Sequence, residues 1–198
     1  MRFVVGIGGA SGARYGRALI RALVDGGQDV ALVVSRGGAR VLEVEEAVRI
    51  DPEAPDPEAL VPGHGGRVVG FPLHDVAAPF SSGTHPVAGM AVCPCSMGTL
   101  SRIAHGTSSN LLERAADVMM KERRRLVLVP REAPYSLVHL RNMTLATEAG
   151  AVVLPASPGF YHDPKTVDDL VAHVVQKVLD SLNAPGNLIR RWGGPGQR

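Results

Sequence analysis

Small, hydroxyl-bearing and cationic residues follow several apolar segments of this chain. The first apolar segment, residues 2–7, runs into a glycine-rich turn that reads GIGGASGA over residues 6–13. Ser35, residues 96–99 and Arg131 each follow a later apolar segment. Glycines let a backbone approach a phosphate closely, and hydroxyls, a guanidinium and helix N-termini bind anions. These residue types predict a site for a phosphorylated ligand.

The elements that must position these residues can be predicted from the pattern of apolar residues. Short segments rich in Val, Ile and Leu alternate with longer segments of helical periodicity, which is typical of β–α units and a parallel sheet covered on both faces. We expect strands at residues 2–7, 29–34, 67–71, 88–93, 126–129 and 151–154, and helices at residues 12–25, 36–48, 96–104, 109–121, 136–149 and 166–182. Such sheets bind ligands beyond the carboxyl ends of their strands, so the turns named above should lie at one edge.

The fold class is therefore α/β, a Rossmann-like or flavodoxin-like doubly wound parallel sheet in three layers and a single domain. Residues 51–66 and 72–86 are rich in Pro, Gly, Ser and His and are predicted to be excursions from this rhythm. We expect the domain to span residues 1–182. Residues 183–198, rich in Gly and Pro around Trp192, are predicted to form an irregular C-terminal arm.

Composition limits the classes of partner. Among the 198 residues, 45% are hydrophobic and the formal net charge is +2, which gives no broad positive field for nucleic acid or anionic lipid. No apolar run approaches the roughly 18 residues of a membrane span, and the first apolar segment leads into a helix with arginines rather than a signal-peptide cleavage site. We expect a cytoplasmic protein with a small-molecule partner. Cys93 and Cys95 are predicted to be buried apolar residues without a metal.

A dinucleotide fold is the obvious rival, because Gly6-x-Gly8-x-x-Ser11 nearly matches the NAD-binding fingerprint. The match fails where Ser11 replaces the third glycine. It fails again where Ser35, rather than an acidic residue for the ribose hydroxyl, ends the second predicted strand. A mononucleotide phosphate is the better ligand.

Four blocks of sequence carry a more specific resemblance. They read GIGGASGARYG, CPCSMGTLSRIAHG, NLLERAADVMMKERRRLVLVPREAPYSLVHLRNM and LPASPGFYHDPKTVDDL. In this order and spacing they resemble the UbiX-type flavin prenyltransferase family over essentially the whole chain. The resemblance implies a flavoprotein domain and a homododecamer. It also implies a metal-independent reaction that joins the dimethylallyl group of dimethylallyl phosphate to N5 and C6 of reduced FMN, giving prenylated FMN for a UbiD-type decarboxylase.

The resemblance also assigns roles to residues. Those placed around the FMN cofactor are Gly9, Ala10, Ser11, Ser35, Ser96, Met97, Gly98, Thr99 and Arg131. Those placed at the dimethylallyl phosphate are Arg114, Lys121, Arg131, Tyr161 and Lys177. Those given a catalytic role are Ser11, Glu45, Lys121, Glu132, Tyr161 and Trp192. Some relatives carry arginine in place of Lys177, which exchanges a two-pronged donor for a point charge.

The chemistry of allyl transfer supports these roles. Breaking an allylic C–O bond leaves extra negative charge on phosphate and cationic character on the allyl group, and both need preorganised partners. Groups suited to the departing phosphate are Lys121, Arg131, Lys177 and the Tyr161 hydroxyl, with Ser11 as a proton relay. Trp192 offers a π face worth about 2 kcal/mol to the allyl cation. Glu45 is a candidate base for the proton lost at C6.

Each of these side chains also has a structural interpretation. Lys121 lies in a charged run typical of a solvated helix end, and Glu45 and Lys177 lie on segments typical of exposed helix faces. Trp192 alone would indicate packing. The seven histidines show no metal-ligand spacing, and His139, His162 and His173 are interpreted as structural.

Two other functions stay open. An FMN-dependent cysteine decarboxylase would share the fold, but it needs a Pro-x-Met-Asn motif that the sequence around residues 139–143 does not provide. A non-catalytic FMN carrier subunit would share the glycine-rich turn. The cations outside the predicted flavin site, at Lys121 and Lys177, favour a second phosphate and therefore a second substrate.

Overall fold

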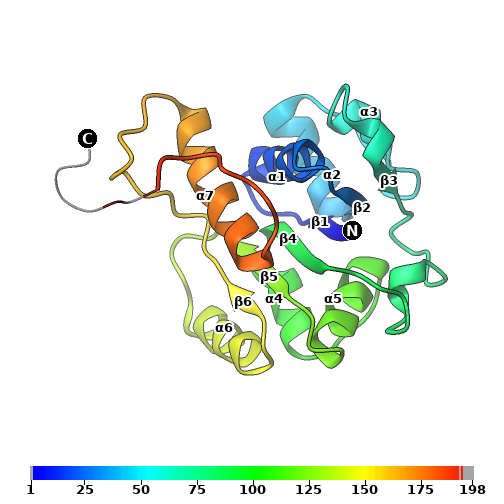
Figure 1. Cartoon of the computed structure of the whole chain (residues 1–198). Helices are drawn as coiled ribbons and strands as arrows, with labels where there is room; N and C mark the ends of the chain where they lie inside the picture. The colour runs from blue at the N-terminus through cyan, green and yellow to red at the C-terminus, as the bar shows by residue number, and fades with distance from the viewer. Residues whose placement is uncertain (1, 192, 194–198) are drawn as a thin grey trace.

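The computed structural model describes residues 2–191 and residue 193, and its centre is a six-stranded parallel sheet (Figure 1). The strands are β1 (Arg2–Ile7), β2 (Asp29–Val34), β3 (Val68–Gly70), β4 (Gly89–Cys95), β5 (Leu126–Pro130) and β6 (Val152–Val153). Their order across the sheet is β3-β2-β1-β4-β5-β6. This is the Rossmann order, whereas a flavodoxin sheet would place its first strand between the second and third. The predicted α/β class is confirmed.

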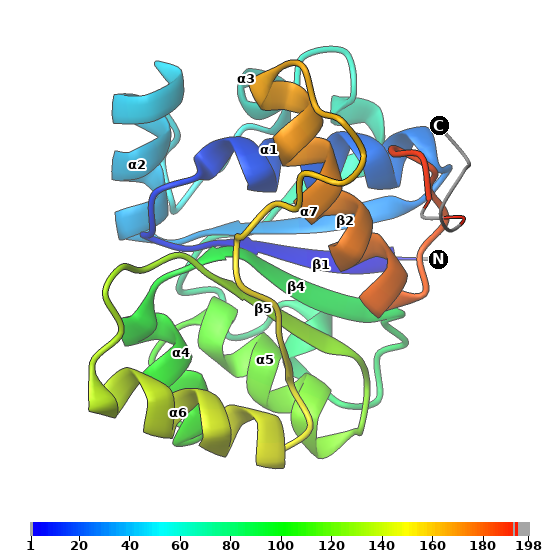
Figure 2. The same cartoon turned by 90° about the vertical axis from the view of Figure 1, so that its left-hand side faces the viewer.

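Helices cover both faces of the sheet, as Figure 2 shows. They are α1 (Ala13–Asp25), α2 (Arg36–Glu46), α3 (Pro57–Leu60), α4 (Met97–Ala104), α5 (Leu111–Lys121), α6 (Leu137–Glu148) and α7 (Val167–Leu182). Helices α1, α2 and α7 lie on one face, and α4, α5 and α6 lie on the other. The excursions hold α3 and two short 3-10 helices, η1 (Gly65–Arg67) and η2 (Pro79–Ser81).

Apolar residues alternate between the two faces of the central strands. In β1, Val5 and Ile7 pack into the core under α1 and α7, while Val4 packs into the core under α4 and α5. Because both faces are covered, the strands are continuous apolar runs rather than alternating ones. The expected bounds of β1 and β2 are therefore reproduced residue for residue.

Strand β4 extends two residues past its predicted end. The sequence predicted an end at residue 93, and the next residue, Pro94, lacks the N–H that a central strand donates. The structure instead shifts the register between Val92 and Cys95 and pairs Cys95 with Pro130 of β5. The carbonyl of Pro94 accepts the Gly8 N–H at 2.9 Å, which ties this strand end to the glycine-rich turn.

The segment after α7 lies along that helix as far as the structure describes it. The Gln176 side chain accepts from the Leu188 N–H at 2.7 Å and donates to the Gly186 carbonyl at 3.3 Å. Arg191 forms an ion pair with Asp180 at 2.8 Å. In the described part of the chain, no helix combines the length and the apolar character needed to cross a membrane.

Candidate active site

A cavity of about 470 Å³ lies where the glycine-rich turn meets the first turns of α2 and α4. Its lining residues are Gly9, Ser35, Arg36, Gly37, Leu73, His74, Ser96, Thr99, Arg102, Ser109 and Asn110. Four of these, Gly9, Ser35, Ser96 and Thr99, were predicted from the sequence to surround a flavin nucleotide. The strand ends therefore bring these predicted groups together, as the parallel sheet requires.

Two helix N-termini face this cavity, and each has a serine cap. The Ser35 hydroxyl accepts from the Gly38 N–H at 2.9 Å at the start of α2. The Ser96 hydroxyl accepts from the Thr99 N–H at 3.2 Å and donates to the Thr99 hydroxyl at 3.0 Å at the start of α4. Both helices direct the positive ends of their dipoles toward the same space. The arrangement suits a phosphate.

The glycines of this region allow two turns to touch. A Cβ on Gly9 would lie 2.8 Å from the Gly37 Cα, and a Cβ on Gly37 would lie 2.9 Å from the Gly9 Cα. Real Cβ atoms do not approach backbone so closely, so any larger residue at either position would separate the first turn from α2. The glycine at position 9 is therefore required by packing as well as by access to a ligand.

Sequence reasoning missed the arginines of the cavity, Arg36 and Arg102, and the polar pair Ser109 and Asn110. Arg36 directly follows the capping Ser35, so its position was available from the sequence. Arg102 lies near the C-terminal end of α4 and reaches the cavity because its side chain extends back toward the first turn, where Nη1 lies 3.6 Å from the position that a Cβ on Gly98 would take. The sequence does not show this contact.

A second group of predicted residues gathers around Glu45. One oxygen of its carboxylate accepts from the Gly12 N–H at 2.9 Å and from the Ala13 N–H at 3.0 Å. Burial alone raises the pKa of the Glu45 carboxyl, but hydrogen bonds from Ser11, Gly12 and Ala13 and the charge of Arg131 outweigh it, so the pKa is lowered. The Glu45 carboxylate thus accepts from N–H groups at the start of α1 that the sequence analysis predicted to bind a phosphate.

A third group joins Tyr161 to α7. The Tyr161 hydroxyl lies 3.1 Å from His173 Nε2, and the Gly159 N–H donates to His173 Nδ1 at 3.2 Å. His173 is buried, and its ring stacks on that of His162 with centroids 5.0 Å apart. Lys177 lies one turn further along α7 and contributes to the lowering of the His173 pKa, after burial and His162. The two predicted substrate residues are therefore both close to His173, in the middle of α7.

Other predicted residues have their hydrogen-bond partners outside these groups. Lys121 ends α5 and forms an ion pair with Glu122, while Arg114 donates to the Ser81 carbonyl at 3.1 Å and pairs with Asp117 at 2.6 Å. The Glu132 carboxylate accepts from the Ala133 N–H at 3.1 Å. Trp192 lies outside the described residues.

Four buried side chains near the site have core roles. Ala10 and Met97 are predicted flavin residues whose side chains are only 6% and 5% exposed, so the backbone is the part of each that could meet a ligand. Cys93 and Cys95 are free and fully buried, as expected, and burial raises the pKa of the Cys95 thiol to about 12. A thiol with so high a pKa is not a nucleophile at neutral pH.

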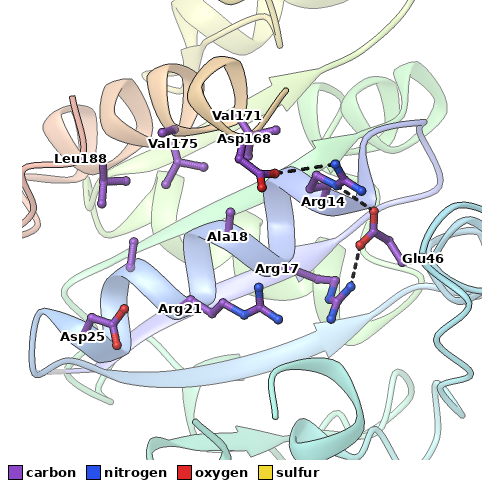
Figure 3. A pocket seen from close by; sticks show the side chains of 12 residues that line it. Arg14, Arg17, Ala18, Arg21, Asp25, Glu46, Asp168, Val171, Val175 and Leu188 are labelled. Carbon is purple, nitrogen blue, oxygen red and sulfur yellow. Dashed lines mark hydrogen bonds and ion pairs between the residues drawn. The ribbon is translucent and has the colours of Figure 1, made fainter. Parts of the chain in front are cut away.

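A separate cavity of about 430 Å³ lies between α1 and α7 (Figure 3). It contains no predicted site residue, and Glu46 in its wall forms ion pairs with Arg17 at 2.5 Å and Arg14 at 3.1 Å. Arg14 also lies 3.6 Å from Asp168 of α7. These pairs neutralise much of the charge in this cavity and link three helices. Within residues 2–191 and 193, no group of three or more His, Cys, Asp or Glu side chains is arranged to hold a metal ion.

Comparison with known proteins places these observations in a family. Residues 1–179 match the family model described as Flavoprotein. The chain is 47% identical over 191 residues to the flavin prenyltransferase UbiX of Halalkalibacterium halodurans, covering 96% of this chain and 93% of that protein.

Similar solved structures belong to the same kind of protein. The crystal structure of AnUbiX (PadA1) in complex with FMN and dimethylallyl pyrophosphate superposes with a TM-score of 0.86 at 39% identity, covering 98% of this chain and 97% of the other. A dodecameric FMN-dependent UbiX-like decarboxylase from Escherichia coli O157:H7 gives a TM-score of 0.84 at 41% identity, covering 98% and 100%. The cysteine decarboxylase TvaF, at 16% identity and a TM-score of 0.60, shares the fold alone.

Proposed function

We propose that this chain, which belongs to the UbiX flavin prenyltransferases of the Flavoprotein family, joins the dimethylallyl group of dimethylallyl phosphate to N5 and C6 of reduced FMN. FMN is the cofactor of this family. We further propose that the chain assembles as a homododecamer and that its product serves a UbiD-type decarboxylase.

The observation that supports this function best is the cavity between α2 and α4. Two capped helix N-termini, the glycine-rich turn and two arginines meet there, and these groups suit the phosphate end of FMN. Reduced FMN, when bound, supplies the nucleophilic N5 and C6 atoms of the reaction. The chain's part is to hold that ring beside a prenyl phosphate.

The group at α7 supports a second phosphate. Tyr161 and Lys177 offer a hydroxyl and an ammonium group near His173, and both can stabilise the charge that develops on a departing phosphate. Arg131, which lies close enough to Glu45 to lower the pKa of its carboxyl, adds a further cation at the same edge. Preorganised cations of this kind can stabilise the leaving group directly.

Glu45 meets one of two requirements for the base that accepts the proton lost from C6. Its low pKa keeps the carboxylate ionised at neutral pH, as a base requires, but also makes it a weaker proton acceptor. A phosphate released beside Ser11 and Arg131 offers a second acceptor for the proton lost from C6. Proton transfer through Ser11 and phosphate therefore suits this site better than direct transfer to Glu45.

One anaerobic assay separates the three candidate functions. The protein is mixed with reduced FMN and either dimethylallyl phosphate or the diphosphate, and the extracted flavin is weighed by mass spectrometry. A flavin heavier by one dimethylallyl unit supports prenyl transfer and identifies the donor. In a parallel mixture with a cysteinyl substrate, release of carbon dioxide indicates a decarboxylase. An unchanged flavin together with no carbon dioxide indicates a carrier.

A further inference from the structure

We propose that Arg102 binds the phosphate of FMN and that the buried carboxylate of Glu113 is the positioning residue that holds Arg102 toward the cavity. The inference rests on the proposed placement of the FMN phosphate in the cavity between α2 and α4. Neither residue belongs to the set that the family resemblance assigned.

Glu113 is a buried carboxylate with every partner supplied by the cavity wall. Its side chain is 1% exposed. One oxygen accepts from Arg102 Nε at 2.5 Å, and the other accepts from the Ser109 N–H at 3.0 Å and the Ser109 hydroxyl at 2.5 Å. Its own N–H donates to the Asn110 side chain at 3.0 Å. The Glu113 carboxylate thus links α4 to the start of α5 through residues that line the cavity.

The ionisation state of Glu113 follows from the same contacts. Burial raises the pKa of this carboxyl, but hydrogen bonds from Ser109, Arg102 and Asn110 reverse the effect and leave the pKa below its usual range. Glu113 is therefore charged at neutral pH. A buried carboxylate is tolerated only where such partners satisfy it.

Arg102 is held by one edge of its guanidinium. Because Glu113 engages the guanidinium through Nε, the outer edge formed by Nη1 and Nη2 can still donate to another anion. Nη1 lies 3.6 Å from the position that a Cβ on Gly98 would take, so the guanidinium reaches back over the first turn of α4. The Arg102 side chain is 46% exposed and lines the cavity. This geometry presents a paired donor to an anion at the Ser96 helix cap.

The direction in which Glu113→Gln changes the affinity for FMN distinguishes a positioning role from simple charge balance. Glu113→Gln removes a negative charge from beside a phosphate, so electrostatics alone predicts tighter binding of FMN. If Glu113 positions Arg102, the same change weakens binding. Glu113 accepts from Arg102 through one oxygen and from Ser109 through the other, whereas glutamine has a single acceptor oxygen. Arg102 and Ser109 then compete for that oxygen, and the hold on Arg102 weakens.

The test is a fluorescence titration of apoprotein with oxidised FMN and, in parallel, with riboflavin, which lacks the phosphate. We expect Arg102→Ala to weaken FMN binding by about 10- to 100-fold and Glu113→Gln by about fivefold, with riboflavin binding unchanged in both. Arg102→Lys should be intermediate, because a point charge replaces the fork. Glu113→Gln should add nothing in the Arg102→Ala background. Arg40→Ala, which removes an exposed cation paired with Glu43 on α2, is the matched control.

Tighter or unchanged FMN binding in Glu113→Gln overturns the positioning role. Equal losses for FMN and riboflavin in Arg102→Ala overturn the phosphate contact. Arg102→Ala and Arg102→Lys change a half-exposed side chain and keep the proposal testable if Glu113→Gln does not fold. Because no prenyl donor is present, the result does not depend on whether the protein transfers a prenyl group.

Discussion

The two nitrogen atoms of His173 have different partners, and this fixes the direction of its bond to Tyr161. Nδ1 accepts from the Gly159 N–H, so the neutral ring carries its proton on Nε2 and donates to the Tyr161 oxygen. Burial, then His162 and Lys177, lowers the pKa of His173, which favours this neutral form. The phenol therefore accepts from His173 and directs its own hydrogen to another acceptor, as binding of a phosphate oxygen requires.

Two substitutions of His173 should separate its two hydrogen bonds. Glutamine can place an N–H near the position of Nε2, whereas asparagine can replace only Nδ1. We expect His173→Asn to lower kcat/KM for the prenyl phosphate about tenfold, and His173→Gln to recover most of that loss. FMN affinity, measured by titration, should stay constant in both. Equal activity in the two variants, or a further loss on adding His173→Asn to Tyr161→Phe, would contradict the positioning role.

Glu45 should make stability depend on pH. Because its pKa is lower in the folded state, the carboxylate contributes stability that is complete above the unfolded pKa of about 4.3 and is lost as pH falls through the folded value. By capping the start of α1, it should contribute about 1 kcal/mol at pH 7. Glu45→Gln should therefore lower the free energy of unfolding at pH 7, and the difference from the parent chain should shrink below pH 4. Urea unfolding at both pH values checks this, and a difference independent of pH would exclude the ionised cap.

At the scale of elements, Glu46 holds three helices together. Its side chain is 10% exposed and pairs with Arg14 and Arg17 of α1, while Arg14 also lies near Asp168 of α7 (Figure 3). Removing one partner of a largely buried pair leaves the other charges uncompensated. We expect Glu46→Gln to lower the free energy of unfolding by about 1–3 kcal/mol, measured by urea denaturation.

A neighbouring residue supplies the control for that prediction. Glu43 lies on the same helix and pairs with Arg40 and Arg49, which are 72% and 88% exposed. Because solvent screens these charges, Glu43→Gln should leave the unfolding midpoint unchanged. Similar effects of the two substitutions would show that Glu46 is not a specific link between helices.

Most elements could be predicted because their signals are local. Apolar runs bounded by Gly, Ser and Asp gave the central strands and the helices that follow them, and side-chain caps such as Ser35, Ser96 and Thr166 explain where α2, α4 and α7 begin. The extension of β4 through Pro94 depends on a register shift against β5 and on the contact with Gly8. Such features arise from packing between distant segments, which local pattern does not contain.

For the molecule as a whole, the sequence predicted where the cavity lies but not all of the residues that line it. The residues at strand ends converge because the sheet is parallel, so Gly9, Ser35 and Ser96 could be predicted to meet. Arg102 reaches the same space from within a helix, through its contact with Glu113, and no motif marks it. The resemblance supplied Lys121, yet within one protomer α5 carries it about 15 Å from the Asn110 end that lines the cavity.

Contacts between subunits offer one way for Lys121 to reach a flavin. Large apolar side chains are exposed on α6 and near the start of α7, among them Leu137, Val138, Phe160 and Val167, at 60% to 71% exposure. Large apolar side chains exposed on both sides of the sheet can be covered when subunits associate. In a symmetric assembly, the α5 of one protomer can contribute to the site of another.

Mixed oligomers test whether sites are shared. If Lys121 acts on the flavin of a neighbouring protomer, an oligomer that combines Lys121→Ala and Tyr161→Phe chains contains some sites with both native residues. Random mixing of equal amounts gives about a quarter of the sites, the product of two probabilities of one half. We expect each variant alone to lose prenyl transfer, and the two proteins co-expressed and purified together to regain about a quarter of the parent activity. Separately purified oligomers mixed without exchange of subunits provide the control and should stay inactive. No recovery in the co-expressed sample would mean that Lys121 and Tyr161 reach each site from the same chain, which contradicts a site divided between them.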